Sequence, residues 1–312
     1  GTSIVFFLPA IIITFNYTGT LDFKSGGIFF DINNNLLINM LVLLFLFGVA
    51  KSALMPFHAW LPSAMVAPTP VSALLHAVAV VKSGVFILIK IILFIFGIEL
   101  LQSTGSDLII IILASTTIII SSIIAIKQDN IKSMLAYSTI GQLSYILLSV
   151  AILAPFSIIA SVLHLIFHAF GKIILFLSSG IMSSCCNIKN LSEINGIATK
   201  LPITMFLVAL GAFIMIGLPP TIGFLSKWYL ILGIIESKKI YLILILIIST
   251  LLNAAYYFPI IYRSYFCKKQ LNNNEKSEDI YLVFPVIIIG IMTFILFFAV
   301  DSIIIFLKEY LI

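Results

Sequence analysis

The apolar positions of this chain form long, unbroken runs that are separated by short polar stretches. Residues 108–126, for example, carry no charged side chain. A helix that crosses a bilayer needs about 20 mostly apolar residues. By that criterion the pattern predicts nine spans, near residues 3–18, 36–60, 71–97, 107–126, 132–153, 157–182, 201–235, 240–265 and 281–307.

The composition of the chain places these runs in a membrane. Hydrophobic residues are 62% of the chain and charged residues are 9%, whereas soluble domains carry roughly 25% charged residues. In lipid, only helices and closed barrels satisfy their own backbone polar groups, and a barrel would show short alternating segments. The sequence therefore predicts an all-α fold, a polytopic helical bundle in the cell (inner) membrane.

Two of the predicted spans contain prolines that should break them. Span 36–60 runs into Pro56, and span 201–235 contains Pro219 and Pro220. Proline removes a backbone donor and clashes with the preceding turn, and paired broken helices mark the ion path in many transporters. Each break could instead be an ordinary proline kink. Two breaks, each with a lysine nearby, favour a functional role.

The distribution of basic residues predicts the orientation of the bundle. The formal net charge is +5, which the positive-inside rule explains better than nucleic-acid binding. One set of alternating loops, which we place in the cytoplasm with the N-terminus, holds eight basic residues: Lys127, Lys132, Lys189, Lys200, Arg263, Lys268, Lys269 and Lys276. The opposite set holds only Lys24, Lys238 and Lys239.

Several ionisable residues fall inside the predicted spans, where they usually face a bundle interior or a water path. They are Lys51, His76, Lys82, His164, His168, Lys172 and Lys227. Those from 164 to 172 step by four, so they share one helix face. A neutral histidine can relay protons through its two ring nitrogens, and burial favours the neutral form of a lysine. The pattern favours a proton relay over histidines that only bind neighbouring helices.

The other buried cations lie in different positions. His76 and Lys82 are six residues apart, which places them about 120° apart around one helix. Lys51 and Lys227 recur in the two broken spans, which suggests an internal repeat. No acid lies between Asp31 and Glu99, so the counter-ion must come from elsewhere or the lysines are often neutral.

No sequence feature points to a cofactor, a metal site or a catalytic residue. The three cysteines, Cys185, Cys186 and Cys267, have the spacing of neither a zinc site nor a disulfide framework. We also find no Gly-rich dinucleotide motif and no cysteine cluster for iron–sulfur ligation. We therefore expect this chain not to be catalytic on its own.

One region of the sequence is very specific. Residues 51–76 read KSALMPFHAWLPSAMVAPTPVSALLH, and the pattern continues with HAFGK at 168–172 and with GLPPTIGFLSK at 217–227. These motifs resemble the antiporter-like subunits that respiratory complex I shares with the Mrp multisubunit Na⁺/H⁺ antiporters. Residues 76–86, HAVAVVKSGVF, look most like the D-type subunit of the Mrp antiporter.

The resemblance covers the whole chain and implies its organisation. Residues 1–312 would form a single proton-conducting domain built from two inverted repeats, each with one broken helix. Residues 3–97 would be the remainder of the first repeat, residues 107–265 the second repeat, and residues 281–307 a C-terminal helix. Members of the family have further helices upstream, including one whose glutamate pairs with the position of Lys51, so we expect this chain to lack its N-terminal helices.

The resemblance also implies a function. We expect an ion-translocating subunit that moves protons through the central lysines and histidines, as part of a multisubunit monovalent cation/proton antiporter. Its partners would be other membrane subunits, protons, Na⁺ and the lipid bilayer, with no nucleic acid. The alternatives are a proton-pumping subunit of NADH:quinone oxidoreductase and a degenerate structural subunit.

Overall fold

The computed structural model describes residues 1–29, 34–268 and 277–311, except for the side chains of His76, Tyr310 and Leu311. Helices dominate these residues, and no β-strand forms among them beyond one isolated bridge between Asn130 and Asn190. The α-helices are α1 (Leu8–Thr18), α2 (Asn35–Gly48), α3 (Trp60–Ser63), α4 (Thr69–Ala73), α5 (Val80–Lys90), α6 (Ile98–Thr104), α7 (Ser106–Ile126), α8 (Ile131–Ala151), α9 (Pro155–Cys186), α10 (Pro202–Ile216), α11 (Ile222–Glu236), α12 (Leu242–Phe266), α13 (Ile280–Phe298) and α14 (Val300–Leu311).

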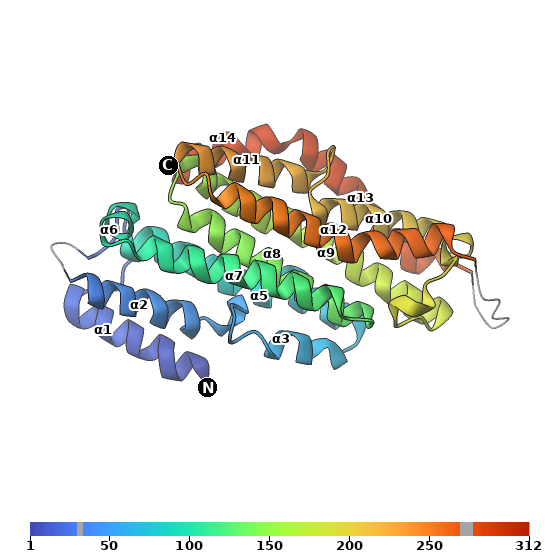
Figure 1. Ribbon diagram of the computed structural model, residues 1–312, viewed down its shortest axis with the longest axis horizontal. Helices are drawn as coiled ribbons and strands as arrows, with labels where there is room; N and C mark the ends of the chain where they lie inside the picture. Colours follow the sequence, from blue (N-terminus) through green and yellow to red (C-terminus); the bar gives the residue numbers. More distant parts are fainter. Residues whose placement is uncertain (30–33, 269–276, 312) are drawn as a thin grey trace.

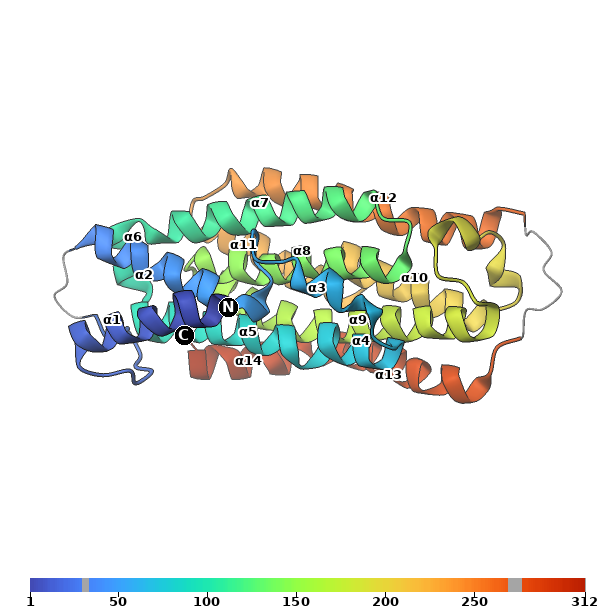
Figure 2. The same ribbon diagram turned by 90° about the horizontal axis from the view of Figure 1, so that it is seen from below.

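The longer helices run side by side along the long axis of the molecule, and the loops gather at its two ends (Figures 1 and 2). At the centre of the bundle lies α8, which is buried along almost its whole length between α7 and α9. Helix α9 also contacts α4, α10, α11 and α13. Polar groups on α8 and α9 are therefore surrounded by protein.

Five helices are long and apolar enough to cross a membrane among the residues that the structure describes: α7, α8, α9, α12 and α13. A sixth span results if the bent pair 80–96 and 98–104 is counted as one. Helices α1, α2 and α10 are apolar but shorter. The predicted all-α membrane bundle is confirmed, and spans 107–126, 132–153, 157–182 and 240–265 each correspond to one continuous helix.

The last predicted span, 281–307, is wrong as a single helix. The chain forms α13 and α14, which meet at Ala299. Asp301 lies in the first turn of α14 and is exposed, although the sequence places it deep in a span. An acidic side chain in a first turn interacts favourably with the helix dipole, so the carboxylate marks a new helix start.

The two broken spans differ in how they break. Helix α2 ends at Gly48, well before Pro56, and the chain then follows an irregular path that includes a 3₁₀ turn over Ala50–Ser52. The indole N–H of Trp60 donates to the Ala50 carbonyl at 2.9 Å. The same carbonyl accepts from the Ala53 N–H at 3.0 Å, so this bond ties the start of α3 to the 3₁₀ turn.

The second break is short and lies where the prolines predict it. Helix α10 ends at Ile216 and is capped by Gly217, whose φ is +82°, and α11 begins at Ile222. At Gly223 a Cβ atom would lie only 1.8 Å from the Ile214 carbonyl oxygen. Glycine therefore lets α11 begin in direct contact with the end of α10.

The loops at one end of the bundle are those for which the sequence predicts a shared side. The Leu191 N–H donates to the Asp129 carbonyl at 2.7 Å, and the Gly196 N–H donates to the Arg263 carbonyl at 2.9 Å. At the opposite end Lys239 and Asp107 form an ion pair at 2.5 Å. Lys269 and Lys276 lie outside the described residues, and the cytoplasmic assignment of the basic end stays a prediction.

Candidate functional site

Five of the seven predicted ionisable residues lie buried in the middle of the bundle. They come from three helices: Lys82 from α5, then His164, His168 and Lys172 from α9, and Lys227 from α11. Each is less than a tenth exposed, and Lys172 is fully buried at 0%. Charges buried to this degree are rare unless they have polar partners, so the partners define the site.

The predicted face of α9 is present. The rings of His164 and His168 stack with their centroids 6.2 Å apart and an angle of 15° between their planes. Stacked rings do not point their nitrogens at each other, and the hydrogen bonds described below run sideways to other helices. The three residues therefore share a face without forming a direct chain of hydrogen bonds.

His164 joins α9 to both α8 and α11. Its Nε2 atom lies 2.9 Å from Oε1 of Gln142, and its Nδ1 atom lies 2.9 Å from Oγ of Ser226. Gln142 and Ser226 are each 1% exposed. The ring is thus held on both sides by neutral polar side chains.

His168 joins α9 to α5. The Nζ atom of Lys82 lies 2.5 Å from Nδ1 of His168. A protonated lysine can only donate, so Nδ1 must then be the acceptor. This contact brings together two ionisable groups that are 86 residues apart in sequence.

Lys172 has the partners that an ammonium group needs. Its Nζ atom donates to the Leu135 carbonyl at 3.0 Å, to Oγ of Ser138 at 2.8 Å and to the hydroxyl of Tyr257 at 3.4 Å. An ammonium has three hydrogens to donate. All three therefore have acceptors from α8 and α12 although the residue has no contact with solvent.

Lys227 lies against the second break. Its Nζ atom donates to the Ile216 carbonyl at 2.6 Å and to the Thr250 hydroxyl at 3.3 Å. Ile216 is the last residue of α10, where carbonyls lose their helical partners. The break thus supplies the lysine with an acceptor, and the Tyr145 ring lies 5.0 Å from its Nζ atom.

Lys51 does not join this cluster. Its side chain is exposed, and no hydrogen bond or ion pair connects it to another residue in the described part of the chain. Instead its backbone packs against α5 at Gly84, where a Cβ atom would lie 2.7 Å from Lys51. The two break lysines therefore differ in exposure, and a role for Lys51 in proton movement stays a prediction. The side chain of His76 lies outside the described side chains, and its role stays a prediction.

Sequence reasoning misses the neutral residues that hold the cations. These partners are Gln142, Ser138, Ser226, Thr250 and Tyr257. Serine, threonine and tyrosine are too frequent in membrane helices to stand out. Gln142 does carry a signal, because an amide in the middle of a span needs partners to remain buried.

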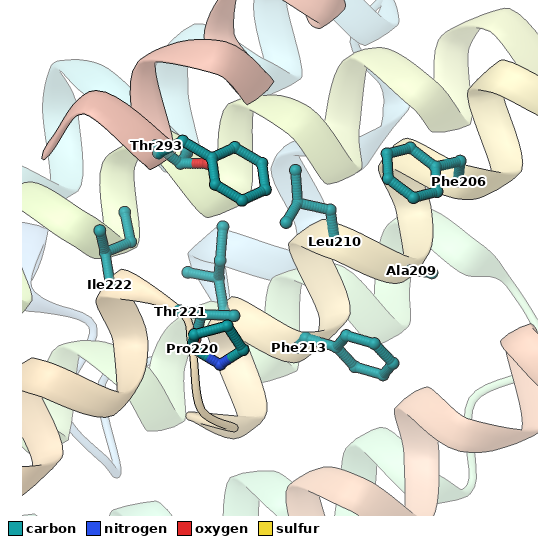
Figure 3. A pocket seen from close by; sticks show the side chains of 10 residues that line it. Phe206, Ala209, Leu210, Phe213, Pro220, Thr221, Ile222 and Thr293 are labelled. Atoms are coloured by element: carbon teal, nitrogen blue, oxygen red, sulfur yellow. The ribbon is translucent and has the colours of Figure 1, made fainter. Parts of the chain in front are cut away.

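An apolar cavity of about 200 Å³ lies beside the second break. Figure 3 shows Phe206, Leu210 and Phe213 of α10 around it, together with Pro220 and Thr293. No ionisable residue is among the described residues that line this cavity. It is therefore separate in chemistry from the buried cations.

Residues 1–253 match the model of a transmembrane family described as NADH:quinone oxidoreductase/Mrp antiporter. NADH-quinone oxidoreductase subunit N of Desulforudis audaxviator (strain MP104C) is 38% identical over 221 residues, which are 69% of this chain and 43% of that protein. A probable K⁺/H⁺ antiporter protein, the A/B subunit of Rhizobium meliloti (strain 1021), is 36% identical over 209 residues, 67% of this chain and 20% of that protein. The chain spans less than half the length of these two relatives.

A solved structure has the same fold. In the structure of the Mrp complex from Dietzia sp. DQ12-45-1b, one chain superposes with a TM-score of 0.84 at 17% sequence identity. The match covers 97% of this chain and 64% of that chain. At this identity the similarity is one of fold.

Proposed function

Because this chain belongs to the transmembrane family of NADH:quinone oxidoreductase and Mrp antiporter subunits, as the sequence predicts, we propose that it moves protons across the membrane along the cations of α5, α9 and α11. The chain is a multi-pass membrane protein, and like its family it belongs in the inner membrane. The path proposed here runs through Lys227, His164, His168, Lys82 and Lys172. The assignment to the D-type Mrp subunit and the two inverted repeats remain part of the proposal.

The observation that carries this proposal is the kind of partner each cation has. In the contacts described above, the cations meet carbonyls, hydroxyls, an amide and, for Lys82 and His168, each other. None of these contacts is with a carboxylate. A carboxylate would hold a lysine in its charged form, whereas neutral partners accept both a charged and an uncharged lysine. These groups are therefore suited to gaining and losing protons.

The spacing of the groups also supports transfer by steps. Tyr145 connects Lys227 to His164, because its ring lies 5.0 Å from the lysine Nζ atom and 5.7 Å from the histidine ring. His164 and His168 are 6.2 Å apart, centroid to centroid. The contacts described above include no hydrogen bond between Lys227, His164 and His168, so we expect a bridging water to carry the proton between them.

For the host complex we propose a multisubunit cation/proton antiporter, with Na⁺ as the exchanged ion and other membrane subunits as partners. The second candidate is a proton-pumping subunit of NADH:quinone oxidoreductase, because the relative from Desulforudis audaxviator is a subunit of that enzyme. Co-purification of tagged chain with its partner subunits separates the two. Flavin-containing and iron–sulfur subunits in the purified complex would favour the oxidoreductase.

Substitution of Lys227 tests the proton-carrier role. In inverted vesicles that contain the whole complex, Lys227→Ala should abolish most proton transport. Lys227→Arg should be nearly as harmful, because arginine stays protonated and cannot release the proton. Lys127→Ala is the matched control, since Lys127 is exposed at the end of α7, and it should transport normally.

The outcomes are distinguishable when subunit levels are measured in the same vesicles. A normal rate in Lys227→Arg at normal assembly would contradict a proton carrier at this position. Normal transport in Lys227→Ala, His164→Ala and His168→Ala together would leave the cluster a packing device. In that case the chain would be a structural subunit.

A further inference from the structure

The contacts of Gln142 show which nitrogen of the neutral His164 ring carries the hydrogen. Gln142 is fixed at its far side, because its Nε2 amide donates to the Met215 carbonyl at 3.4 Å. Its Oε1 atom therefore faces the ring, at 2.9 Å from Nε2 of His164. A carbonyl oxygen can only accept. The hydrogen of the neutral imidazole is thus on Nε2, and Nδ1 is left as an acceptor.

Ser226 lies between two acceptors. Its Oγ atom is 2.9 Å from Nδ1 of His164 and 3.0 Å from the Gly223 carbonyl oxygen. A hydroxyl has a single hydrogen to donate but two lone pairs with which it can accept. It can therefore serve Nδ1 as a donor, or it can donate to Gly223 and accept from an N–H at Nδ1.

We propose that Ser226 positions His164 in both of its protonation states by turning its hydroxyl between these two acceptors. With a neutral ring, the hydroxyl donates to Nδ1. When Lys227 gives up a proton through a bridging water, its N–H bond breaks, an N–H bond forms at Nδ1 of His164, and the positive charge passes from the lysine to the ring. The hydrogen bond from Ser226 to Nδ1 breaks at the same time, and the hydroxyl hydrogen turns to the Gly223 carbonyl. This role rests on the proposed function, because it matters only if His164 gains and loses protons.

Rotation of the Ser226 hydroxyl changes a hydrogen bond at the start of α11. Gly223 is in the first turn of α11, next to the second break, and Ser226 directly precedes Lys227. The protonation state of His164 therefore decides whether the first turn of α11 keeps the hydrogen bond between Ser226 and Gly223. The groups that face the ring are Gln142 and Tyr145 of α8, Ser226 of α11 and His168 of its own helix, and the cations that act on it are Lys227 of α11 and Lys82 of α5.

The test compares two substitutions of almost equal shape. Ser226→Thr keeps the hydroxyl, and Ser226→Val replaces it with a methyl group. Because a hydrogen bond to a charged group is lost, transport by the Val variant in vesicles should fall roughly 10-fold or more, while the Thr variant should stay within about 2-fold of wild type. The same pair at Ser144 is the control, because the hydroxyl of Ser144 donates to the Ile140 carbonyl of its own helix.

Each result decides the question. Equal losses in the Thr and Val variants, or wild-type transport in the Val variant while His164→Ala is inactive, would overturn the role of Ser226 and leave the proposed function intact. Normal transport in His164→Ala alone would also overturn the role of Ser226, whereas the proposed function itself fails only if Lys227→Ala and His168→Ala transport normally as well.

A second measurement does not depend on the Ser226 variants and observes the wild-type complex itself. Nitrogen NMR of histidine-labelled wild-type complex, with His164→Asn to identify the His164 signals, reports which ring nitrogen carries the hydrogen. We expect the Nε2–H form for the neutral ring. An Nδ1–H form would overturn the proposal.

Discussion

Replacing Lys172 by methionine should separate the folding of this bundle from its transport. The residue is fully buried, so its substitution tests both properties at once. Methionine keeps the length and the apolar stem of lysine but has no proton to carry. We expect the Met variant to assemble normally and to lose most of its proton transport.

The expected effect on stability follows from the acceptors that the substitution leaves behind. The Leu135 carbonyl also accepts from the Thr139 hydroxyl at 2.8 Å, and Ser138 and Tyr257 bond each other at 2.7 Å. None of the three loses its last partner. Burying an ammonium costs several kcal/mol even when it is well bonded, and apolar replacement of buried charges is often neutral or stabilising. The free energy of unfolding should therefore stay within about 1 kcal/mol of wild type or rise.

Alanine at the same position makes the informative contrast. It removes the whole stem and leaves a cavity, and core truncations of this size destabilise by about 2–5 kcal/mol. Thermal unfolding of the purified complex and proton uptake by inverted vesicles would be measured for both variants. A Met variant as unstable as the Ala variant would refute the reasoning about acceptors, and a Met variant that transports normally would remove Lys172 from the path.

Three other predictions come from the packing and the loops. Gly223→Ala places a methyl group against a backbone carbonyl and should lower the free energy of unfolding by about 3 kcal/mol. Gly171→Ala meets only side-chain atoms, the end of Met215 and a methyl group of Ile214, and should lower it by about 1 kcal/mol, as thermal unfolding would show. Lys239→Met should lower the free energy of unfolding more than the double variant Lys239→Met with Asp107→Asn does. The single variant leaves the Asp107 carboxylate, which is only 8% exposed, without the lysine that pairs with it. A reporter fused after Lys189 should read as cytoplasmic and one after Lys239 as external, and the reverse result would refute the loop-charge rule here.

The course of the helices can largely be predicted from the sequence. Long apolar runs define α7, α8, α9 and α12 to within a few residues, because lipid forces each run to satisfy its own backbone. The second break also lies where Pro219 and Pro220 predict it. Periodicity likewise places His164, His168 and Lys172 on one face of α9, and the stacked rings agree with this.

The connections between helices could not be predicted in this way. Periodicity gives the face of a helix but not the helix opposite it, so Lys82 and His168 look unrelated in sequence although their nitrogens are 2.5 Å apart. The neutral partners Gln142 and Ser226 are ordinary residues until the packing of α8, α9 and α11 brings them to one ring. At the first break the sequence suggests a similarity that the packing does not show. Each break has a lysine nearby, but Lys51 is exposed whereas Lys227 is buried.

The close spacing of these cations has a consequence for how protons would move along them. Two unit charges 6.2 Å apart, the separation of the His164 and His168 rings, repel by about 3 kcal/mol at an effective dielectric constant of 20. The contacts described for His164 and for the Lys82–His168 pair include no carboxylate that would offset this repulsion. A proton on His164 therefore disfavours a second proton on the Lys82–His168 pair by roughly a hundredfold. On the proposed function, arrival of a proton at one group promotes its departure from the next, which gives stepwise transfer without a large movement of the helices.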